Sequence, residues 1–337
     1  MSLGDNHVFK KVLIVGVGSI GNRHLRCFLK TKRVRLAICD SDVALTESVA
    51  KRYGVKELYT SLENALENPP DIAVICTPAH LHIPMGIQLA ESGVDLMIEK
   101  PLSTTCDNLV RLNRAVDDNH LTCGVAYVLR HHPCLIDVHK IVASNRFGAP
   151  LQLTLTSGQH FPYYRPAYRE IYYADHKTGG GAIQDALTHM MNASQWLLGP
   201  TTSLICDADH LSLDGVSVED TVHVLARHGN TMASLTLNQF QAPNESTLML
   251  NFQRGTIRVE FHRNHWHFCD TPQGEWNLGA SYEIDRDDLF IDQANVFLDH
   301  CLNQTGPTCS LAEATHTLNT NLAMLRSTKS QHWIDLT

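Results

Sequence analysis

Three side chains in this sequence have the types and the spacing needed to move a proton. Lys100 follows the apolar run of the stretch VDLMIEKPLSTT, residues 94–105. Asp185 and His189 lie four residues apart in GGGAIQDALTH, so they share one face of a helix. A lysine can hydrogen-bond a substrate oxygen, an imidazole can take up its proton near neutral pH, and a carboxylate can orient that imidazole. The three residues therefore favour proton abstraction from a hydroxyl group.

Simpler interpretations exist for the same residues. Glu99 and Lys100 also fit an ordinary surface ion pair. A histidine in a buried helix is more often a core residue than a catalyst. The glycines at 179–181 favour a functional site, because three glycines do not belong in a helix interior and they let the backbone approach a ligand closely.

A second set of residues has the spacing of a dinucleotide site. The string GVGSIG follows a β-branched run and precedes a helical pattern, and Asp40 lies nineteen residues after its last glycine. In that setting the glycines allow a tight turn and close approach of a diphosphate to the helix N-terminus, while Asp40 accepts hydrogen bonds from ribose hydroxyls. Asp40 would repel a 2′-phosphate, and Ser41 and Asp42 follow it in place of an arginine, so NAD is favoured over NADP.

Strand and helix patterns alternate through the first 125 residues. The apolar runs at 10–18, 34–40, 72–78, 94–101 and 121–129 are separated by helical patterns at 19–32, 42–54, 82–93 and 106–119. These runs are apolar throughout, which is typical of parallel strands covered by helices on both faces. Residues 1–125 are therefore predicted to form an α/β Rossmann domain. Its ligands should bind beyond the carboxyl ends of the strands, where Thr77, Pro78 and Glu99 lie.

The second half of the chain changes to a period of two. Alternating segments at 151–158, 202–213, 219–229, 231–240, 246–252, 255–262 and 265–269 predict a large, mostly antiparallel open sheet. Helical patterns occur at 133–144, 182–199, 289–302 and 311–325. Residues 126–337 are predicted to be an α+β domain for substrate binding and oligomerisation, and the terminal helices are expected to pack back on the first domain.

Composition narrows the class of protein. The 337 residues suggest two domains, with 43% hydrophobic and 18% charged residues and a net charge of −8, which argues against nucleic-acid binding. No apolar run approaches the roughly 18 residues that a membrane helix needs. Ten cysteines without CxxC pairs predict a reducing, cytoplasmic location.

Two further clusters are weaker candidates. The segment HFPYYRPAYREIYYADHKTGGG has aromatic faces and planar donors that suit sugars, although it is equally well an ordered surface loop or an oligomer contact. Its candidate substrate residues are Tyr163, Arg165, Tyr168, Arg169 and Tyr172. A group that resembles metal ligands consists of His262, His265, His267 and Cys269. Because no second cluster completes a closed site, no metal is expected.

The motifs together carry a family resemblance over nearly the whole chain. VGVGSIGNRHLR, CTPAHLH, EKPLS, LRHHP and GGGAIQDALTH resemble the glucose–fructose oxidoreductase/inositol dehydrogenase family, Gfo/Idh/MocA. The resemblance implies that Lys100, Asp185 and His189 form a catalytic trio, and that the bond before Pro101 is cis. Relatives commonly carry aspartate where this chain has Asn192. The cofactor-binding residues expected from the glycine motif and the resemblance are Gly16, Gly18, Ser19, Ile20, Gly21, Asp40, Thr77, Pro78, His82, Glu99 and Lys100.

The resemblance also implies an activity. It points to an NAD-dependent dehydrogenase that oxidises a secondary alcohol of a sugar, sugar derivative or cyclitol, in which His189 removes the hydroxyl proton, Lys100 hydrogen-bonds the same oxygen and Asp185 orients His189. Two alternatives within the family are a redox-neutral, NAD-dependent glycoside hydrolase and a non-catalytic regulator that senses dinucleotide. A homo-dimer or homo-tetramer paired through the open sheet is expected.

Overall fold

Two compact units make up the chain. The computed structural model describes residues 10–336. Within them, unit 1 contains the residues up to Glu99, then Asp107–Ala126 and Phe290–Leu311. Unit 2 contains Lys100–Cys106, Tyr127–Leu289 and the residues from Ala312 on. The sequence predicts one domain boundary, at 125/126. In the structure the chain passes from one unit to the other at 126/127 and at four other points.

Unit 1 is a parallel sheet with helices, in the strand order β3-β2-β1-β4-β5-β6. This order and the parallel pairing confirm the predicted Rossmann fold. The strands are β1 (Lys10–Val15), β2 (Val34–Cys39), β3 (Glu57–Tyr59), β4 (Ile72–Ile75), β5 (Asp95–Ile98) and β6 (Cys123–Val125). The helices are α1 (Ser19–Thr31), α2 (Val43–Tyr53), α3 (Leu62–Leu66), α4 (His82–Glu91), α5 (Leu109–Asp118) and most of α9 (Asp288–Asn303).

Local sequence signals explain where these elements begin and end. Asp42 caps α2 by accepting a hydrogen bond from the Leu45 amide, and Gly54 ends this helix in the left-handed region, with φ +71°. All four residues of β4 are buried, because helices cover both faces of the sheet. The sequence alone does not predict β3 and α3, since three and five residues are too few to show a period.

Unit 2 is built on a nine-stranded sheet in the order β14-β13-β12-β11-β7-β10-β9-β8-β15. Neighbouring strands pair antiparallel except β7 and β10, which confirms the prediction of a mostly antiparallel sheet. The strands are β7 (Pro150–Gly158), β8 (Ser203–Asp209), β9 (Thr221–His228), β10 (Thr231–Asn238), β11 (Glu245–Phe252), β12 (Gly255–Glu260), β13 (His265–Cys269), β14 (Asn277–Ser281) and β15 (Ile334–Asp335). The helices are α6 (Pro133–Ala143), α7 (Phe161–Tyr164), α8 (Thr188–Leu198) and α10 (Leu311–Ser330).

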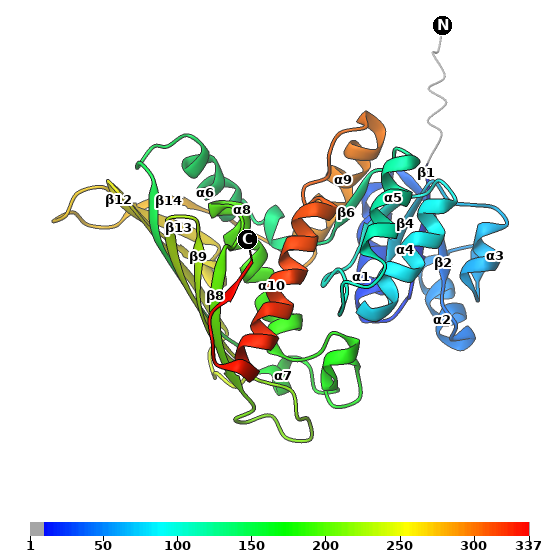
Figure 1. The fold of residues 1–337 in the computed structure, drawn as a ribbon. Coiled ribbons are helices and arrows are strands. Elements are labelled where there is room, and N and C mark those ends of the chain that lie inside the picture. The colour runs from blue at the N-terminus through cyan, green and yellow to red at the C-terminus, as the bar shows by residue number, and fades with distance from the viewer. Residues whose placement is uncertain (1–9, 337) are drawn as a thin grey trace, which may run out of the picture. The chain divides into compact units, whose positions relative to one another are not determined.

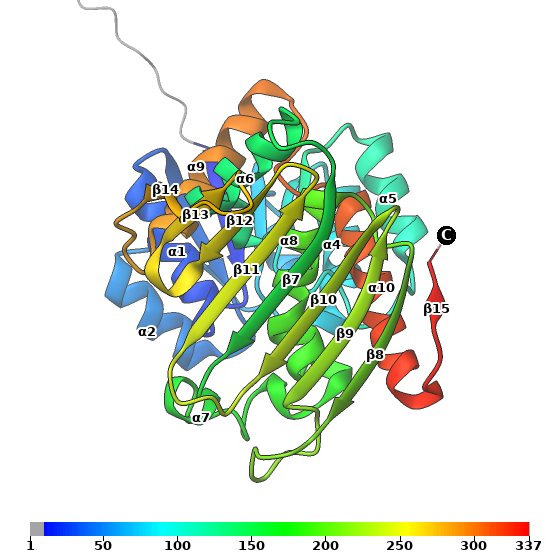
Figure 2. The same cartoon turned by 90° about the vertical axis from the view of Figure 1, so that its left-hand side faces the viewer.

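The helices of unit 2 cover one face of this sheet. Figure 1 shows α6, α8 and α10 along that inner face, and Figure 2 turns the opposite, outer face of β8, β9, β10, β7 and β11 toward the viewer. Burial alternates accordingly along β9, where Val222 and Val224 are buried while His223 and Leu225 are exposed. The core of unit 2 lies between the inner face and these helices.

The segment expected to be one helix over 182–199 differs at its start. Ile183–Leu187 form a π-helical turn, and α8 begins only at Thr188. A π-helical turn is rare and is found mostly as a single turn inserted in an α-helix, often at a functional site. Periodicity does not reveal it, because one wide turn hardly shifts the spacing of apolar residues.

No helix among residues 10–336 combines the length and the apolar character that a membrane span requires.

Candidate active site

In the glycine-rich turn between β1 and α1, Gly16 and Gly21 each have their own steric reason to be glycine. Gly16 has φ +85°, and a Cβ there would lie 3.0 Å from the Cys76 carbonyl and the Thr77 amide nitrogen. A Cβ on Gly21 would lie 1.8 Å from the Gly16 carbonyl oxygen, so α1 packs directly on the turn. Around Gly18, by contrast, a Cβ would meet no described atom within 4 Å.

The open side of this turn fits a dinucleotide. Gly18 and Ser19 are exposed, no side chain caps the N-terminus of α1, and its first turn has no acidic residue. The amide groups at a helix N-terminus attract a diphosphate. The Asp40 carboxylate lies beside the turn, where it accepts hydrogen bonds from the amides of Val17 (2.8 Å) and Asp42 (3.0 Å). These residues would hold the diphosphate and the adenosine ribose of NAD.

The segments that follow β4 and β5 each contact a buried histidine side chain. His82 at the start of α4 hydrogen-bonds the Thr77 carbonyl oxygen at 2.8 Å, which fixes the turn through Thr77 and Pro78. The Glu99 carboxylate lies 2.6 Å from His24 Nε2 of α1, and both side chains are buried. Glu99 therefore joins the end of β5 to the helix that begins at the glycine-rich turn.

In unit 2, Lys100 and Asp185 form a partly buried ion pair. Lys100 Nζ donates to the Asp185 carboxylate at 3.0 Å and to the Asp185 carbonyl oxygen at 2.7 Å. Their side chains are 14% and 13% exposed, so the pair is shielded but still reachable. The Tyr172 hydroxyl donates to the same carboxylate oxygen of Asp185 at 2.7 Å. The peptide bond between Lys100 and Pro101 is cis, as the resemblance implies.

The charge of Asp185 follows from these contacts. Burial alone would raise the pKa of its carboxyl group, but the charge of Lys100, the hydrogen bonds from Tyr172 and Lys100, and the charge of Arg165 together lower this pKa. Asp185 is thus an anion at neutral pH. It can hold the ammonium group of Lys100 in one place.

His189 lies at the start of α8, one residue after Thr188. Its ring meets the ring of Tyr127 edge-on, with centroids 6.0 Å apart. The Tyr127 hydroxyl lies 3.1 Å from the Thr188 hydroxyl, which accepts a hydrogen bond from Asn321 of α10 at 2.9 Å. This buried network fixes the first turn of α8 and the aromatic wall beside His189.

Asn192, the position that departs from the family pattern, has a structural role. Its side-chain oxygen accepts a hydrogen bond from Arg130 Nε at 2.8 Å, and its amide donates to the Thr317 hydroxyl at 2.9 Å. Arg130 is itself buried and pairs with Glu313 at 2.6 Å. An amide can accept on one side and donate on the other, which a carboxylate at this position could not do.

The turn that carries Asp185 is fixed by Glu219. The Glu219 carboxylate accepts a hydrogen bond from the Ile183 amide at 2.8 Å, and its carbonyl oxygen accepts one from the Ala182 amide at 2.9 Å. Gly181 has φ +86°, and a Cβ there would lie 2.6 Å from that carboxylate. The other Glu219 oxygen pairs with His176. Glu219 thus supplies the cap that the start of this helix lacks in its own sequence.

The five candidate substrate residues divide into two groups. Tyr168 is only 1% exposed and donates its hydroxyl to the Asp214 carbonyl oxygen, which also accepts from Arg169. These two side chains therefore support the fold of the loop. Tyr172 and Arg165 act on Asp185, as described above, and Tyr163 is 78% exposed.

Sequence reasoning missed His24, Tyr127 and Glu219. Each acts on a residue far along the chain: His24 lies 75 residues before Glu99, and Glu219 lies 36 residues after Ile183. The Glu219 carboxylate, two residues before β9, offered no local signal. For His24, the only available signal was its place in the motif GNRHLR.

Comparisons with known proteins identify the family and agree with the fold. Residues 10–127 match a family model described as "Oxidoreductase family, NAD-binding Rossmann fold", GFO_IDH_MocA, and residues 135–258 match the GFO/IDH/MocA C-terminal domain. The levoglucosan dehydrogenase of Pseudarthrobacter phenanthrenivorans is 29% identical over 168 residues, which cover 49% of this chain and 43% of that enzyme. The inositol 2-dehydrogenase of Rhizobium meliloti is 28% identical over 189 residues, or 55% of this chain and 54% of that enzyme.

Each of these matches spans about half of the relative's own length. A solved structure of levoglucosan dehydrogenase in complex with NADH is similar over 97% of this chain and 99% of that chain, with a TM-score of 0.89 and 19% sequence identity. At this identity the likeness shows a common fold.

Gly18→Ala and Gly21→Ala should separate cofactor binding from folding. A Cβ on Gly18 meets open space, so we expect Gly18→Ala to keep its melting temperature and to bind NAD at least about tenfold more weakly, about 1.4 kcal/mol. Gly21→Ala forces a backbone contact and should lower the melting temperature. Thermal melts and calorimetric titration with NAD check both. NAD affinity unchanged in Gly18→Ala would show that the diphosphate does not approach this glycine.

The pair of His176 and Glu219 should make stability depend on pH. The hydrogen bond and the charge of Glu219 raise the pKa of His176 above its ordinary value, against burial and the charge of Lys329. The stabilisation is fully present below about pH 6.5, where the unfolded histidine is also protonated, and is lost as the pH rises through the higher native pKa.

Other histidines with lowered pKa values oppose this trend, so wild type is compared with His176→Asn. The difference in free energy of unfolding should be larger at about pH 6 than at about pH 9. Urea denaturation at both pH values measures it. A difference that is constant with pH would contradict the role given to His176.

Proposed function

Because the chain belongs to the Gfo/Idh/MocA oxidoreductase family, we propose that it is an NAD-dependent dehydrogenase that oxidises a secondary alcohol of a sugar, sugar derivative or cyclitol. The observation that carries the proposal is the ion pair of Lys100 and Asp185 next to the turn that leads to His189. A protein that only senses a dinucleotide has no need for such a set. The names of the relatives, levoglucosan dehydrogenase and inositol 2-dehydrogenase, support the class of substrate.

The chain's own residues divide the proton chemistry between them. Bound NAD supplies the hydride acceptor. Lys100 donates a hydrogen bond to the substrate hydroxyl oxygen and stabilises the negative charge that develops there. His189 takes the hydroxyl proton as general base. Asp185 contacts Lys100 twice, which supports a role in positioning the lysine, in addition to the orientation of His189 expected from the sequence.

The substrate side belongs to the segment before the π-helical turn. Tyr172 and Arg165 already act on Asp185, and the exposed ring of Tyr163 offers an apolar face of the kind that stacks on sugar rings. We therefore keep these three as substrate residues. Tyr168 and Arg169 are assigned to the fold.

Two further expectations are part of this proposal. The outer face of the large sheet offers alternating apolar side chains, among them Leu225 (54% exposed) and Met232 (51% exposed), through which a homo-dimer or homo-tetramer would pair. A cytoplasmic location remains a prediction from the cysteine content.

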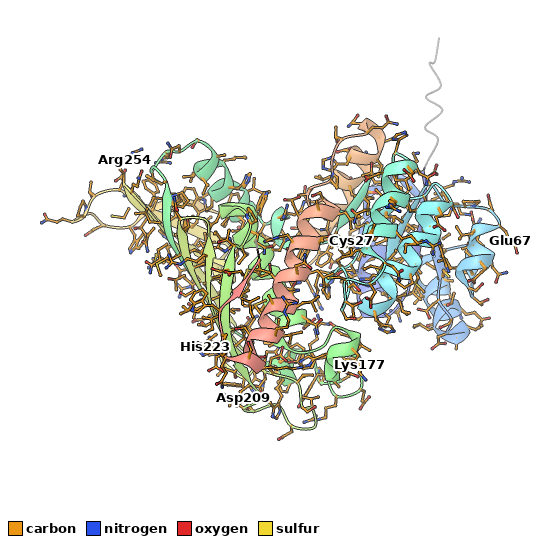
Figure 3. All side chains as sticks on the ribbon, viewed as in Figure 1. Cys27, Glu67, Lys177, Asp209, His223 and Arg254 are labelled. Carbon is orange, nitrogen blue, oxygen red and sulfur yellow. The ribbon has the colours of Figure 1, made fainter. Side chains whose placement is uncertain are left out.

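Substitution of the two reactive side chains tests the mechanism. We expect Lys100→Met and His189→Ala each to lower kcat/KM by about 10²–10⁴-fold, because each removes a proton-handling group, while NAD affinity is retained. Lys140→Met is the matched control, since Lys140 is an exposed lysine of the same unit on α6, outside the substrate segment that contains Lys177, which Figure 3 labels.

The assay follows NADH absorbance with a panel of inositols, aldoses, sugar acids and aryl glycosides, together with release of the aglycone. NADH formation with one polyol supports the dehydrogenase. Aglycone release without NADH would indicate the redox-neutral glycoside hydrolase instead, and full activity of either variant would contradict the assigned roles.

A further inference from the structure

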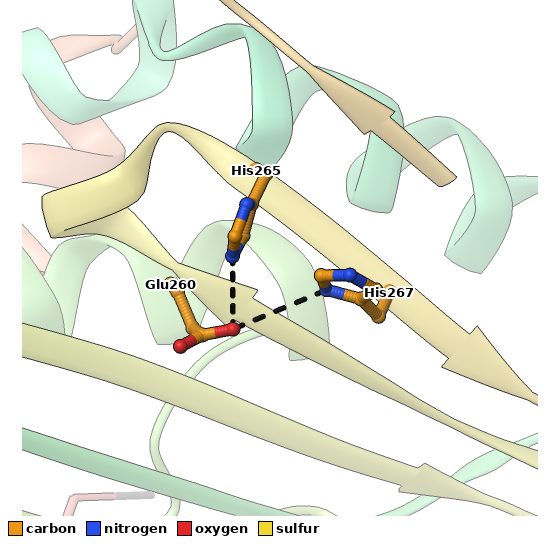
Figure 4. Close-up of side chains that lie close together, drawn as sticks. All are labelled: Glu260, His265 and His267. Carbon is orange, nitrogen blue, oxygen red and sulfur yellow. Dashed lines mark hydrogen bonds and ion pairs between the residues drawn. The ribbon is translucent and has the colours of Figure 1, made fainter. Parts of the chain in front are cut away.

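Three potential metal ligands converge on the outer face of the large sheet. Glu260 of β12 pairs with His265 of β13, and Arg258 pairs with His267, so all four side chains point to the same face. His265 Nε2 lies 2.9 Å and His267 Nδ1 lies 4.0 Å from the same oxygen of Glu260, Oε2. Figure 4 shows the two imidazoles reaching this one oxygen.

The three ligand atoms are close to the spacing that a metal ion requires. They lie within 4.8 Å of one another. Ligands at about 2.0–2.1 Å from a tetrahedral zinc ion are about 3.3 Å apart, and the two distances to Oε2 lie on either side of that value. A small rotation of each imidazole is sufficient to bring the three atoms around one ion.

His267 gives an independent indication of a missing partner. Its Nδ1 atom is buried, and among residues 10–336 it has no hydrogen-bond partner, although it faces Glu260. A buried polar atom without a partner is costly, and such atoms are found where a metal ion or an ordered water binds. A metal ion between His267 and Glu260 would satisfy it.

We propose that Glu260, His265 and His267 bind a transition-metal dication of the zinc class, which joins β12 to β13 on the outer face of the sheet. Two imidazoles and one carboxylate suit zinc, cobalt or nickel, and water completes the coordination. The sequence marks His262, His265, His267 and Cys269 as candidate ligands, but Glu260 comes next to His265 and His267 only through strand pairing. For this reason the sequence-based expectation of no metal overlooks Glu260.

Two arginines compete for the same carboxylate. Arg258 Nε lies 3.5 Å from Oε2, and Arg263 lies 3.8 Å from Oε1 with its side chain 62% exposed. Arg258 also lies over the ring of Trp276, 4.6 Å from its centroid, so it has a second partner when Oε2 binds a metal. Because both charges oppose a dication, we expect binding in the micromolar range.

Titration of the metal-free protein with zinc sulfate tests the site. Calorimetry and metal analysis after gel filtration should show one zinc equivalent fewer in His265→Ala/His267→Ala than in wild type. The control is His223→Ala, because His223 is exposed on the same outer face in β9 and lies four strands from β12, about 19 Å away. Comparison of variants is needed because the chain has 20 histidines, some of which will bind zinc weakly.

A second variant guards against misfolding. Glu260→Gln keeps the shape of the side chain and both histidines, and should weaken zinc binding and change the visible absorption of bound cobalt. Equal zinc stoichiometry in wild type, His265→Ala/His267→Ala and His223→Ala would overturn the proposal. An unchanged cobalt spectrum in Glu260→Gln would overturn the assignment of Glu260 as a ligand.

Discussion

The contact between Lys100 and Asp185 is the constraint on which the candidate active site in unit 2 depends. Withdrawing two opposite charges from water is costly, and the cost is recovered only if the geometry is good and the remaining hydrogen-bonding groups are satisfied. Here the Asp185 carboxylate accepts hydrogen bonds from Lys100 and Tyr172, and Lys100 also donates to the Asp185 carbonyl oxygen. The pair is thereby held in place and partly shielded from water. A charge acts more strongly on a substrate when it is shielded in this way.

The backbone around Asp185 is arranged to keep this contact. A π-helical turn widens the helix at Ile183–Leu187, and Glu219, two residues before β9, binds the amides at its start. Gly181 is needed there because of its positive φ and because Glu219 leaves no room for a Cβ. Substitutions at Glu219 should therefore change the position of Asp185 through the backbone, although Glu219 itself is not assigned any contact with a substrate.

Much of the fold and part of the site follow from local sequence. The glycine turn, Asp40 and the cap at Gly54 are short-range features, so spacing alone predicts them. The apolar or alternating pattern of the sequence also predicts every β-strand of more than four residues except β14. Tertiary pairing decides the rest. His24, Glu219 and Glu260 bind partners on other elements, and neither the π-helical turn nor the structural use of Tyr168 changes the hydrophobic period. The sequence singles out Lys100, Asp185 and His189 as candidates, but it does not predict the contact between Lys100 and Asp185.

The most direct test of the account is a double-mutant cycle on Lys100→Met and Asp185→Asn, measured as kcat/KM for the substrate found in the panel. If Asp185 acts mainly by holding Lys100, the double variant should lose much less activity than the two single losses combined, since most of the effect of Asp185 then passes through the lysine. Losses that add in full would mean that the two residues act independently, and would contradict the central role given to their contact.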